Sequence, residues 1–258
     1  MSNIHPTAII DTKAELADDV EVSPYAVIGA GVKMDSGCWV GPHAVIEGPT
    51  TIGKDNRIFQ FASVGAEPQD KKYKGEPTTL QIGDRNVIRE NVTINRGTAQ
   101  DIGKTVIGDD NWIMAYVHIA HDCIVGNNTI FANNATLAGH VTIHDYALLG
   151  GFTLVHQFCH IGEYAMTGMG TSLGKDLPPY ITAYGAPGVP RGFNNEGLKR
   201  NGFSAEQRSK VKEAYKTLYR KDLPLNDAIS ELQASEDSNI QLMADFCLRS
   251  QNGRGIIR

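Results

Sequence analysis

Apolar residues recur every six positions along most of the chain. The first unbroken series is Ile10, Leu16, Val22, Ile28, Met34, Val40, Ile46, Ile52, Ile58 and Val64. The period resumes at Ile82, Ile88 and Ile94, and a third series is Ile107, Ile113, Ile119, Val125, Phe131, Leu137, Ile143, Leu149, Val155, Ile161, Thr167 and Leu173. A six-residue period fits neither a helix of 3.6 residues per turn nor the two-residue alternation of an ordinary strand. It predicts a solenoid in which each repeat is a short strand followed by a corner.

The residue two places before a periodic position is often small, as at Ala26, Ala44, Ala135 and Ala147. We expect the large and the small residue to point inward together, with three hexapeptides forming one triangular coil and successive coils pairing as parallel strands. The polar segments near residues 66–79 and 98–105 interrupt the period and are predicted to be insertions. Together these features predict an all-β domain over residues 1–190.

This hexapeptide pattern resembles the left-handed parallel β-helix of the hexapeptide acyltransferase superfamily. The left-handed sense of the coil is implied by that resemblance alone, because a period does not determine handedness.

The six-residue period stops after Pro190, and a helical pattern follows. Residues 204–207, with the sequence SAEQ, have the form of a capping box, and Val211, Tyr215 and Leu218 then recur at helical spacing. Further helices are predicted around residues 226–234 and 239–249. We therefore expect a small α-helical domain over residues 191–258, which closes one end of the solenoid where unpaired strand edges would otherwise invite aggregation.

Composition narrows the classes of function. The net charge of −5 disfavours broad binding to nucleic acid. The four cysteines are widely separated and form no CxxC pair, so we interpret them as small buried residues rather than as a disulfide framework or a zinc ribbon. The sequence contains no apolar run long enough to span a bilayer, and its N-terminus does not resemble a signal peptide. A cytoplasmic location is therefore expected.

Six of the eight histidines lie between His118 and His160. In a coil of three hexapeptides, His121, Gly139 and Gln157 form one column, with about 4.8 Å between coils, and Asp122 and His140 lie in the next column. The glycine leaves room for a substrate beside His121 and offers a backbone N–H that can stabilise an oxyanion. A histidine is also the natural base for taking a proton from a hydroxyl near neutral pH. This arrangement suits acyl transfer.

Two other interpretations of the histidines stay open. They could belong to solvated faces without function, although their clustering on adjoining coils disfavours this. The pair His118 and His121 has a spacing seen in zinc sites. However, residues three apart on a strand point to opposite faces, which weakens that interpretation.

Five sequence segments resemble the UDP-N-acetylglucosamine O-acyltransferase family. They occur in order across nearly the whole chain and read QDKKYKGEPT from Gln69, HIAHDC from His118, LAGH ending at His140, VHQF from Val155 and NNEGLKRNGF from Asn194. The resemblance implies transfer of a (R)-3-hydroxyacyl group from acyl carrier protein to the glucosamine 3-hydroxyl of UDP-N-acetylglucosamine, the first step of lipid A biosynthesis. It implies no metal and no organic cofactor, and a homotrimer with active sites between subunits.

The resemblance also assigns site residues. It implies that His121 is the general base and that the Gly139 amide contacts the oxyanion; the column argument points to the same pair. Asp122 is expected to orient the base, although neighbouring strand side chains normally point apart. The substrate-binding residues implied are Asp70, Lys72, His118, His140, His156, Gln157, Asn194, Glu196 and Arg200. Arg200 can donate two hydrogen bonds to a phosphate at once, whereas Lys72 provides a compact positive charge.

Met169 occupies the position at which family members set acyl-chain length. A glycine there leaves a long groove and a methionine blocks it, so the resemblance implies a chain of about ten carbons; ordinary packing is the alternative role for Met169. Two residues depart from the usual pattern: Asn95 stands where a histidine is common, and Asn201 where a second basic residue is frequent. They place nucleotide affinity in question. The resemblance also leaves open whether the acceptor atom is oxygen or nitrogen.

The predicted helix after Ser204 carries the cations Arg208, Lys210, Lys212, Lys216, Arg220 and Lys221. Such a surface suits an acidic carrier protein, although runs of charge are commonly only solvated faces.

Three rival functions remain. They are another hexapeptide acyltransferase with an amine acceptor or acetyl-CoA as donor, a zinc lyase of the γ-carbonic-anhydrase type, and a non-catalytic β-solenoid. The last would need flat threonine ladders, which the sequence lacks.

Overall fold

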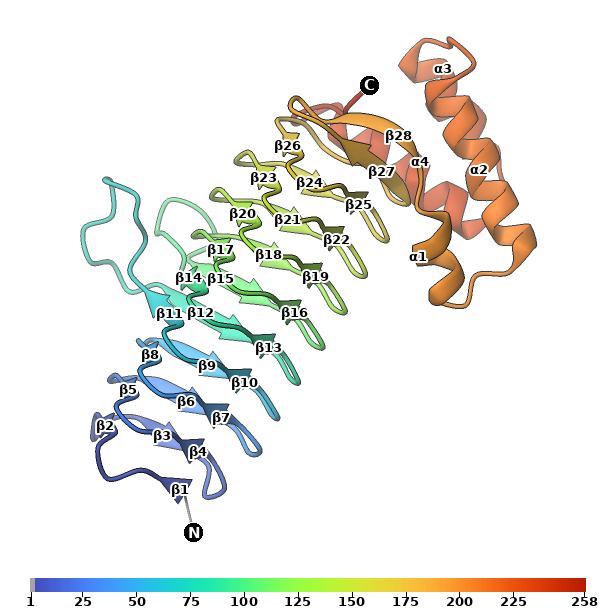
Figure 1. Ribbon diagram of the computed structural model, residues 1–258. Coiled ribbons are helices and arrows are strands. Elements are labelled where there is room, and N and C mark those ends of the chain that lie inside the picture. The colour runs from blue at the N-terminus through green and yellow to red at the C-terminus, as the bar shows by residue number, and fades with distance from the viewer. Residues whose placement is uncertain (1–2) are drawn as a thin grey trace.

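The computed structural model describes residues 3–258 and shows a triangular parallel β-helix followed by a helical domain (Figure 1). Each hexapeptide contributes one short strand, and every third strand pairs with the one a coil away. Where no insertion intervenes, a residue pairs with the one three hexapeptides later, as His118 does with Thr136. The six-residue period therefore produces the predicted coil.

The strands form three sheets, one for each wall of the triangle. The first wall contains β1 (Asn3–Ile4), β4 (Glu21–Val22), β7 (Trp39–Val40), β10 (Arg57–Ile58), β13 (Val87–Ile88), β16 (Trp112–Ile113), β19 (Ile130–Phe131), β22 (Leu148–Leu149), β25 (Met166–Thr167), β27 (Ile181–Tyr184) and β28 (Val189–Phe193). The second wall contains β2 (Ile9–Ile10), β5 (Val27–Ile28), β8 (Val45–Ile46), β11 (Ser63–Ala66), β14 (Thr93–Asn95), β17 (His118–Ile119), β20 (Thr136–Leu137), β23 (Leu154–Val155) and β26 (Ser172–Leu173). The third wall contains β3 (Glu15–Leu16), β6 (Val32–Met34), β9 (Thr50–Ile52), β12 (Thr79–Ile82), β15 (Lys104–Ile107), β18 (Ile124–Val125), β21 (Thr142–Ile143) and β24 (His160–Ile161).

The periodic residues fill the prism. From Val22 onward they are buried, whereas Ile10 and Leu16 in the first coil are only partly buried. The polar exception, Thr167, is also fully buried, and its hydroxyl lies 2.7 Å from that of Thr153. Because this pairing supplies a hydrogen bond in the core, one polar residue is tolerated there. The four cysteines are free and buried, as the sequence predicts.

The C-terminal domain contains α1 (Asn195–Arg200), α2 (Ala205–Tyr219), α3 (Leu225–Gln233) and α4 (Ser238–Ser250). The capping box at Ser204 is confirmed, since its side chain accepts from the N–H of Gln207 and the Gln207 side chain accepts from the Ser204 N–H. Helix α1 was not predicted from the sequence. The boundary placed at residue 190 falls inside β28, which pairs antiparallel with β27 and continues the first wall to Phe193. Among the described residues, no helix has the length and apolar character needed to cross a bilayer.

Candidate active site

Two insertions leave the coil at the same corner, between the second and third walls. Residues 67–78 join β11 to β12, and residues 96–103 join β14 to β15. Figure 1 shows both loops projecting on the same side of the prism. Buried Arg96 ties them together, because its guanidinium donates to the Gly65 carbonyl at 2.8 Å and to the hydroxyl of Tyr73 at 3.3 Å. The insertions thus wall off one part of this corner.

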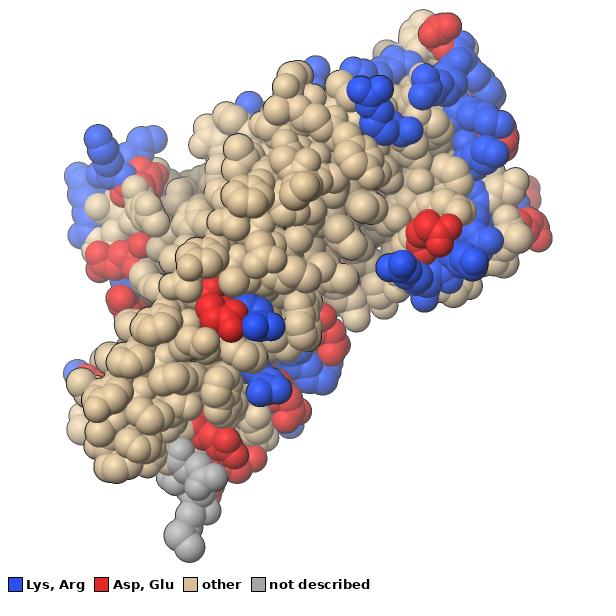
Figure 2. Space-filling view, viewed as in Figure 1, with Lys and Arg blue, Asp and Glu red and all other residues tan. Residues whose placement is uncertain are grey.

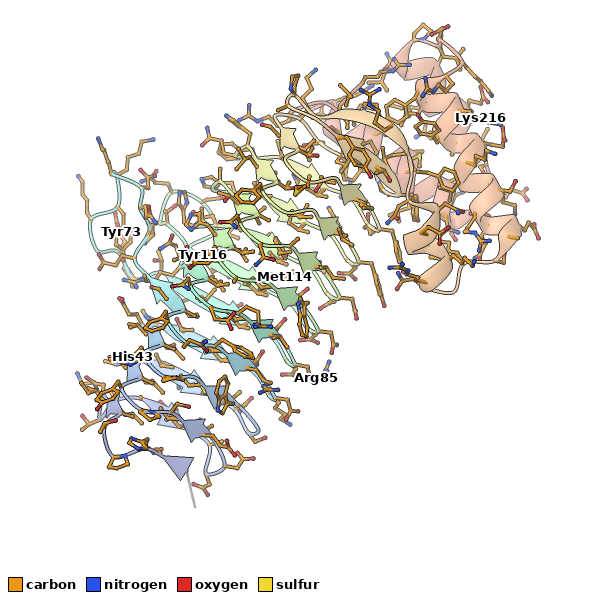
Figure 3. All side chains as sticks on the ribbon, in the orientation of Figure 1. His43, Tyr73, Arg85, Met114, Tyr116 and Lys216 are labelled. Carbon is orange, nitrogen blue, oxygen red and sulfur yellow. The ribbon has the colours of Figure 1, made fainter. Side chains whose placement is uncertain are left out.

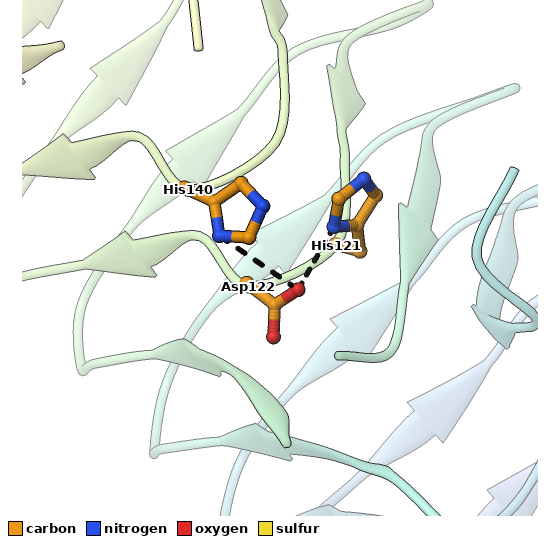
Figure 4. A group of neighbouring side chains, drawn as sticks. All are labelled: His121, Asp122 and His140. Carbon is orange, nitrogen blue, oxygen red and sulfur yellow. Dashed lines mark hydrogen bonds and ion pairs between the residues drawn. The ribbon is translucent and has the colours of Figure 1, made fainter. Parts of the chain in front are cut away.

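His121 and Asp122 lie at this corner in the coil that follows the second insertion. The Nδ1 atom of His121 is 2.8 Å from Oδ2 of Asp122 (Figure 4). The expectation that adjacent side chains point apart is wrong here, because the two residues form a corner and not a strand. The backbone of Asp122 is left-handed, with φ of 58°, and this turns its carboxylate toward the imidazole.

Asp122 is buried and held by the second insertion. Its carboxylate accepts from the N–H of Thr98 at 2.9 Å and from the Thr98 hydroxyl at 2.7 Å. Burial raises the pKa of the Asp122 carboxyl, but the hydrogen bonds from His121 and Thr98 outweigh burial, so the pKa lies below its usual value. The ionised carboxylate accepts a hydrogen bond from the Nδ1–H of His121, which leaves Nε2 of the ring free to act as a base.

Gly139 lies directly against the His121 ring. A Cβ atom on Gly139 would be 2.6 Å from Cε1 and 2.8 Å from Nε2 of His121. Only glycine allows this approach, since such distances are shorter than van der Waals contact. The N–H of Gly139 donates to no acceptor within the described chain. The free imidazole nitrogen and an unpaired amide therefore lie within one coil of each other, as the column argument predicts.

His140 faces the same space from the next coil. Its Nδ1 atom lies 2.6 Å from Oδ2 of Asp101 in the second insertion, and its ring meets that of His121 edge-on with centroids 5.0 Å apart. The ring of Phe158, one coil further on, stacks on His140 at 4.4 Å.

His121, His140 and Phe158 line a cleft of about 760 Å³. The lining consists of Gln69, Asp70, Lys72, Gln100, Asp101, Ala120, His121, His140, Gln157 and Phe158. The cleft therefore combines both insertions with three successive coils. Its size is that of a ligand-binding cleft, and its walls carry one lysine, two carboxylates and two imidazoles.

The structure places the other candidate residues in two groups. His118 lies on β17 beside the cleft, with Nδ1 2.7 Å from the Thr93 hydroxyl, and His156 is exposed next to Gln157. Asn194, Glu196, Arg200 and Met169 do not line the cleft of their own chain. Asn194 is buried and caps α1, with its side chain accepting from the Gly197 N–H. Figure 1 shows α1 on the side of the coil away from the insertions.

Sequence reasoning missed the residues that hold the histidines. Asp101, Thr98 and Phe158 each contact a histidine or its carboxylate partner. Phe158 could have been found, since it follows His140 by one full coil. Asp101 and Thr98 could not have been found in this way, because they lie in an insertion, which breaks the 18-residue register that relates one coil to the next.

His121, Asp122 and His140 also form a group able to hold a metal ion, with ligand atoms within 4.8 Å of one another. A cation on Asp122 would compete with three hydrogen bonds that its carboxylate already accepts. His118, which the sequence offered as a zinc ligand, is not part of this group.

Acid should destabilise the fold through His118. Burial, and to a lesser extent nearby His121, lowers the pKa of His118 below the usual 6.5. The unfolded chain therefore takes up a proton near pH 6.5 that the folded chain takes up only at lower pH, so the free energy of unfolding falls as the pH drops below about 6.5, by at most about 1.4 kcal/mol per pH unit for one proton. Denaturant titrations between pH 7.5 and 5.5 should show a shallower pH dependence for His118→Gln than for the wild type. An unchanged slope in His118→Gln would contradict this assignment.

Comparisons with known protein families agree with the two-part architecture. The family description "Udp N-acetylglucosamine O-acyltransferase; Domain 2" matches residues 176–257, and "Bacterial transferase hexapeptide (six repeats)" matches residues 104–139. The acyl-[acyl-carrier-protein]–UDP-N-acetylglucosamine O-acyltransferase of Janthinobacterium sp. (strain Marseille) is 59% identical to this chain, over 100% of both sequences. The protein of the same name from Thiobacillus denitrificans is 57% identical, again over 100% of both.

Solved structures of similar proteins have the same fold as this chain. The UDP-N-acetylglucosamine acyltransferase of Francisella novicida superimposes with a TM-score of 0.96 at 43% identity, covering 99% of this chain and 94% of that one. The UDP-N-acetylglucosamine O-acyltransferase of Moraxella catarrhalis gives a TM-score of 0.95 at 42% identity, covering 99% and 100%. The predicted fold, a left-handed parallel β-helix with a small helical C-terminal domain, is confirmed.

Proposed function

Because the chain belongs to the UDP-N-acetylglucosamine O-acyltransferase family, we propose that it carries out the reaction for which its relatives are named. The enzyme transfers a (R)-3-hydroxyacyl group from acyl carrier protein to the glucosamine 3-hydroxyl of UDP-N-acetylglucosamine, which begins lipid A biosynthesis. The observation that carries the proposal is the packing of the His121 ring against the peptide of Gly139, at the wall of a large cleft.

His121 acts as the general base in this proposal. The Asp122 carboxylate holds Nδ1 at 2.8 Å, so Nε2 is free to take the proton of the sugar hydroxyl. The hydroxyl oxygen then attacks the thioester carbonyl, and the amide of Gly139 stabilises the negative charge that develops on the carbonyl oxygen. Collapse of the tetrahedral intermediate expels the carrier thiolate, which takes up the proton that His121 removed from the sugar hydroxyl, so the base is regenerated. No cofactor takes part.

The cleft supplies the groups that hold the nucleotide sugar. Lys72 and Asp70 reach it from the first insertion, and His140 and Gln157 reach it from the following coils. His118 and His156 flank these residues. Lysine suits a phosphate and the remaining groups suit sugar hydroxyls, because they donate and accept hydrogen bonds.

A homotrimer would complete the site. Asn194, Glu196, Arg200 and Met169 lie outside the cleft of their own chain, so a neighbouring subunit has to present them. The corner between the first and second walls also exposes the large apolar side chains of Tyr116, Phe152 and Met169. Exposed apolar surface of this extent supports burial against another subunit.

The acidic carrier protein would approach the helical domain. Figure 2 shows Lys and Arg side chains gathered over the C-terminal helices. Several of these cations are already paired, as Lys210 is with Glu206 and Asp237 at 3.2 Å. Arg208, Lys212 and Arg220 make no ion pair with any described residue, so they are the cations we propose for docking. We also propose a cytoplasmic location, where the acyl carrier protein is available.

Met169 should limit the acyl chain to about ten carbons. Its side chain is 79% exposed and sits at the corner of the coil, so it can reach the groove between subunits. We expect Met169→Gly to accept a fourteen-carbon donor at a rate at least about tenfold above that of the wild type, because the shorter side chain opens space for four methylenes worth about 0.8 kcal/mol each. Comparing turnover of ten- and fourteen-carbon donors checks this. Failure of Met169→Gly to gain long-chain activity would show that Met169 does not limit the length of the acyl chain.

Mass spectrometry of the product tests the function itself. UDP-N-acetylglucosamine incubated with mixed 3-hydroxyacyl carrier proteins should yield a monoacylated nucleotide sugar, esterified at the 3-position. A nucleotide with a 3-amino group in place of the hydroxyl, offered in competition, decides between oxygen and nitrogen as acceptor. Absence of acyl transfer to either nucleotide would refute the proposal.

The His121, Asp122 and His140 group favours a zinc lyase as the second candidate. Elemental analysis of the purified protein separates the two functions. Stoichiometric zinc that is lost in His140→Ala would support the lyase.

A further inference from the structure

The ring of Phe158 lies flat against His140. Their centroids are 4.4 Å apart and the planes differ by 9°. On its edge, His140 is fixed by Asp101, whose carboxylate lies 2.6 Å from Nδ1. The imidazole that lines the cleft is therefore held at two places, by an insertion and by the next coil.

Packing alone does not hold the Phe158 ring. It is 49% exposed, lines the active-site cleft and also lines a second cavity of about 100 Å³. That cavity is bounded further by His160, Asp176, Phe246, Arg249, Ser250 and Gly253. Since open space lies on two sides of the ring, other contacts have to fix its position.

Arg254 supplies such a contact from the C-terminal segment. Its Nε donates to the Gln157 carbonyl at 3.0 Å, and its guanidinium carbon is 6.0 Å from the centre of the Phe158 ring. At this range a cation attracts the face of an aromatic ring. Arg254 thus contacts two consecutive residues of the active-site corner.

The segment that carries Arg254 is itself bonded to the coil. The N–H of Asp176 donates to the Gly255 carbonyl at 2.9 Å, and the N–H of Ile257 donates to the Asp176 carbonyl at 2.9 Å. The buried Asp176 carboxylate also accepts from the Ser250 hydroxyl at 2.5 Å. Leu177 pairs with Ile161 of the preceding coil, and the N–H of His160 donates to the Asp176 carboxylate at 2.8 Å, so the tail is anchored to the coil two residues from Phe158.

We propose that Phe158 is a positioning residue for His140 and that Arg254 of the C-terminal tail holds Phe158 in place. The inference rests on the proposed function, in which His140 contacts the nucleotide sugar. It makes the helical domain part of the active-site structure, beyond its role as a cap on the coil.

The chain offers a matched control for the stacked pair. Phe61 stacks on His43, which likewise lies one coil earlier, with centroids 5.3 Å apart and planes differing by 10°. Both phenylalanines have a left-handed backbone, with φ of 62° at Phe61 and 63° at Phe158. Figure 3 shows His43 among the N-terminal coils, away from the second insertion. Truncation of Phe61 therefore repeats the structural change without touching the cleft.

Steady-state kinetics distinguish positioning from general stability. We expect Phe158→Leu to raise KM for UDP-N-acetylglucosamine by about three- to tenfold, because this factor corresponds to the free energy that one aromatic pair contributes. Arg254→Met should raise it by about two- to fivefold, the worth of an exposed cation–π contact. Phe158→Tyr, which keeps the stack, should restore KM to within about twofold of the wild-type value, and Phe61→Leu should leave KM unchanged.

A double-mutant cycle with His140→Ala tests whether Phe158 acts through His140. In that background, Phe158→Leu should have no further effect on KM, because the ring that it positions is gone. Additive effects, or equal changes in Phe158→Leu and Phe61→Leu, would overturn the inference. A crystal structure of Phe158→Leu gives a reading that does not depend on catalysis: a displaced His140 ring supports positioning, and an unmoved ring refutes it, whatever reaction the enzyme carries out.

Discussion

Replacing His121 by alanine should lower kcat by about 10²- to 10⁴-fold, which is the usual contribution of a positioned general base. The loss should appear in kcat rather than in KM, because Nε2 acts on the proton that moves in the transition state. His121 lies at a corner and its side chain is 16% exposed, so its removal leaves the apolar interior of the coil intact. The thermal unfolding midpoint should therefore change little.

His43→Ala provides the control for this variant. His43 also lies at a corner, and it stacks between Tyr25 and Phe61 outside the cleft. It should keep wild-type kcat. Near-full activity in His121→Ala would remove the general base from the mechanism, even if the fold and the family are correct.

Gly139→Ala should lower kcat by about 10²-fold or more, an effect as large as the loss of one oxyanion donor. The added methyl group would lie 2.6 Å from Cε1 of His121, closer than any real contact, so the imidazole has to move. A displaced His121 ring loses its hydrogen bond to Asp122 and no longer lies beside the backbone amide of residue 139. The methyl group also occupies the space in which the reacting carbonyl is expected.

The control for Gly139→Ala is Gly174→Ala. A Cβ at Gly174 meets no atom within 4 Å, so this variant should keep both its activity and its unfolding temperature. Measuring kcat and the unfolding midpoint for both variants separates damage to the site from damage to the coil. If Gly139→Ala were fully active, the close packing of imidazole and glycine would have no part in catalysis.

The coil was predictable because it depends on one short-range rule. An inward aliphatic every six residues and a corner between strands set the register of every wall, so residues one coil apart are neighbours. That rule alone places His121 beside Gly139. The same rule locates Phe158 above His140, a contact that sequence reasoning passed over.

The rule does not predict the contacts made by the insertions or by a neighbouring subunit. Asp101 and Thr98 hold His140 and Asp122, yet they belong to a loop whose path is set by tertiary contacts such as those of Arg96. The expectation that the side chains of His121 and Asp122 point apart is wrong, because a left-handed corner does not follow the alternation of a strand. Asn194, Glu196 and Arg200 were assigned by resemblance, and one chain does not bring them to the cleft.

The most direct test of the account is a structure of the wild-type enzyme with its acylated nucleotide sugar bound. The account predicts Nε2 of His121 within about 2.6–3.2 Å of the 3-oxygen of the sugar, the reach expected of a general base. It also predicts the carbonyl oxygen of the acyl group at the N–H of Gly139, and the uridine diphosphate at Arg200 of a neighbouring copy. A 3-oxygen held by another group, with His121 facing solvent, would contradict it.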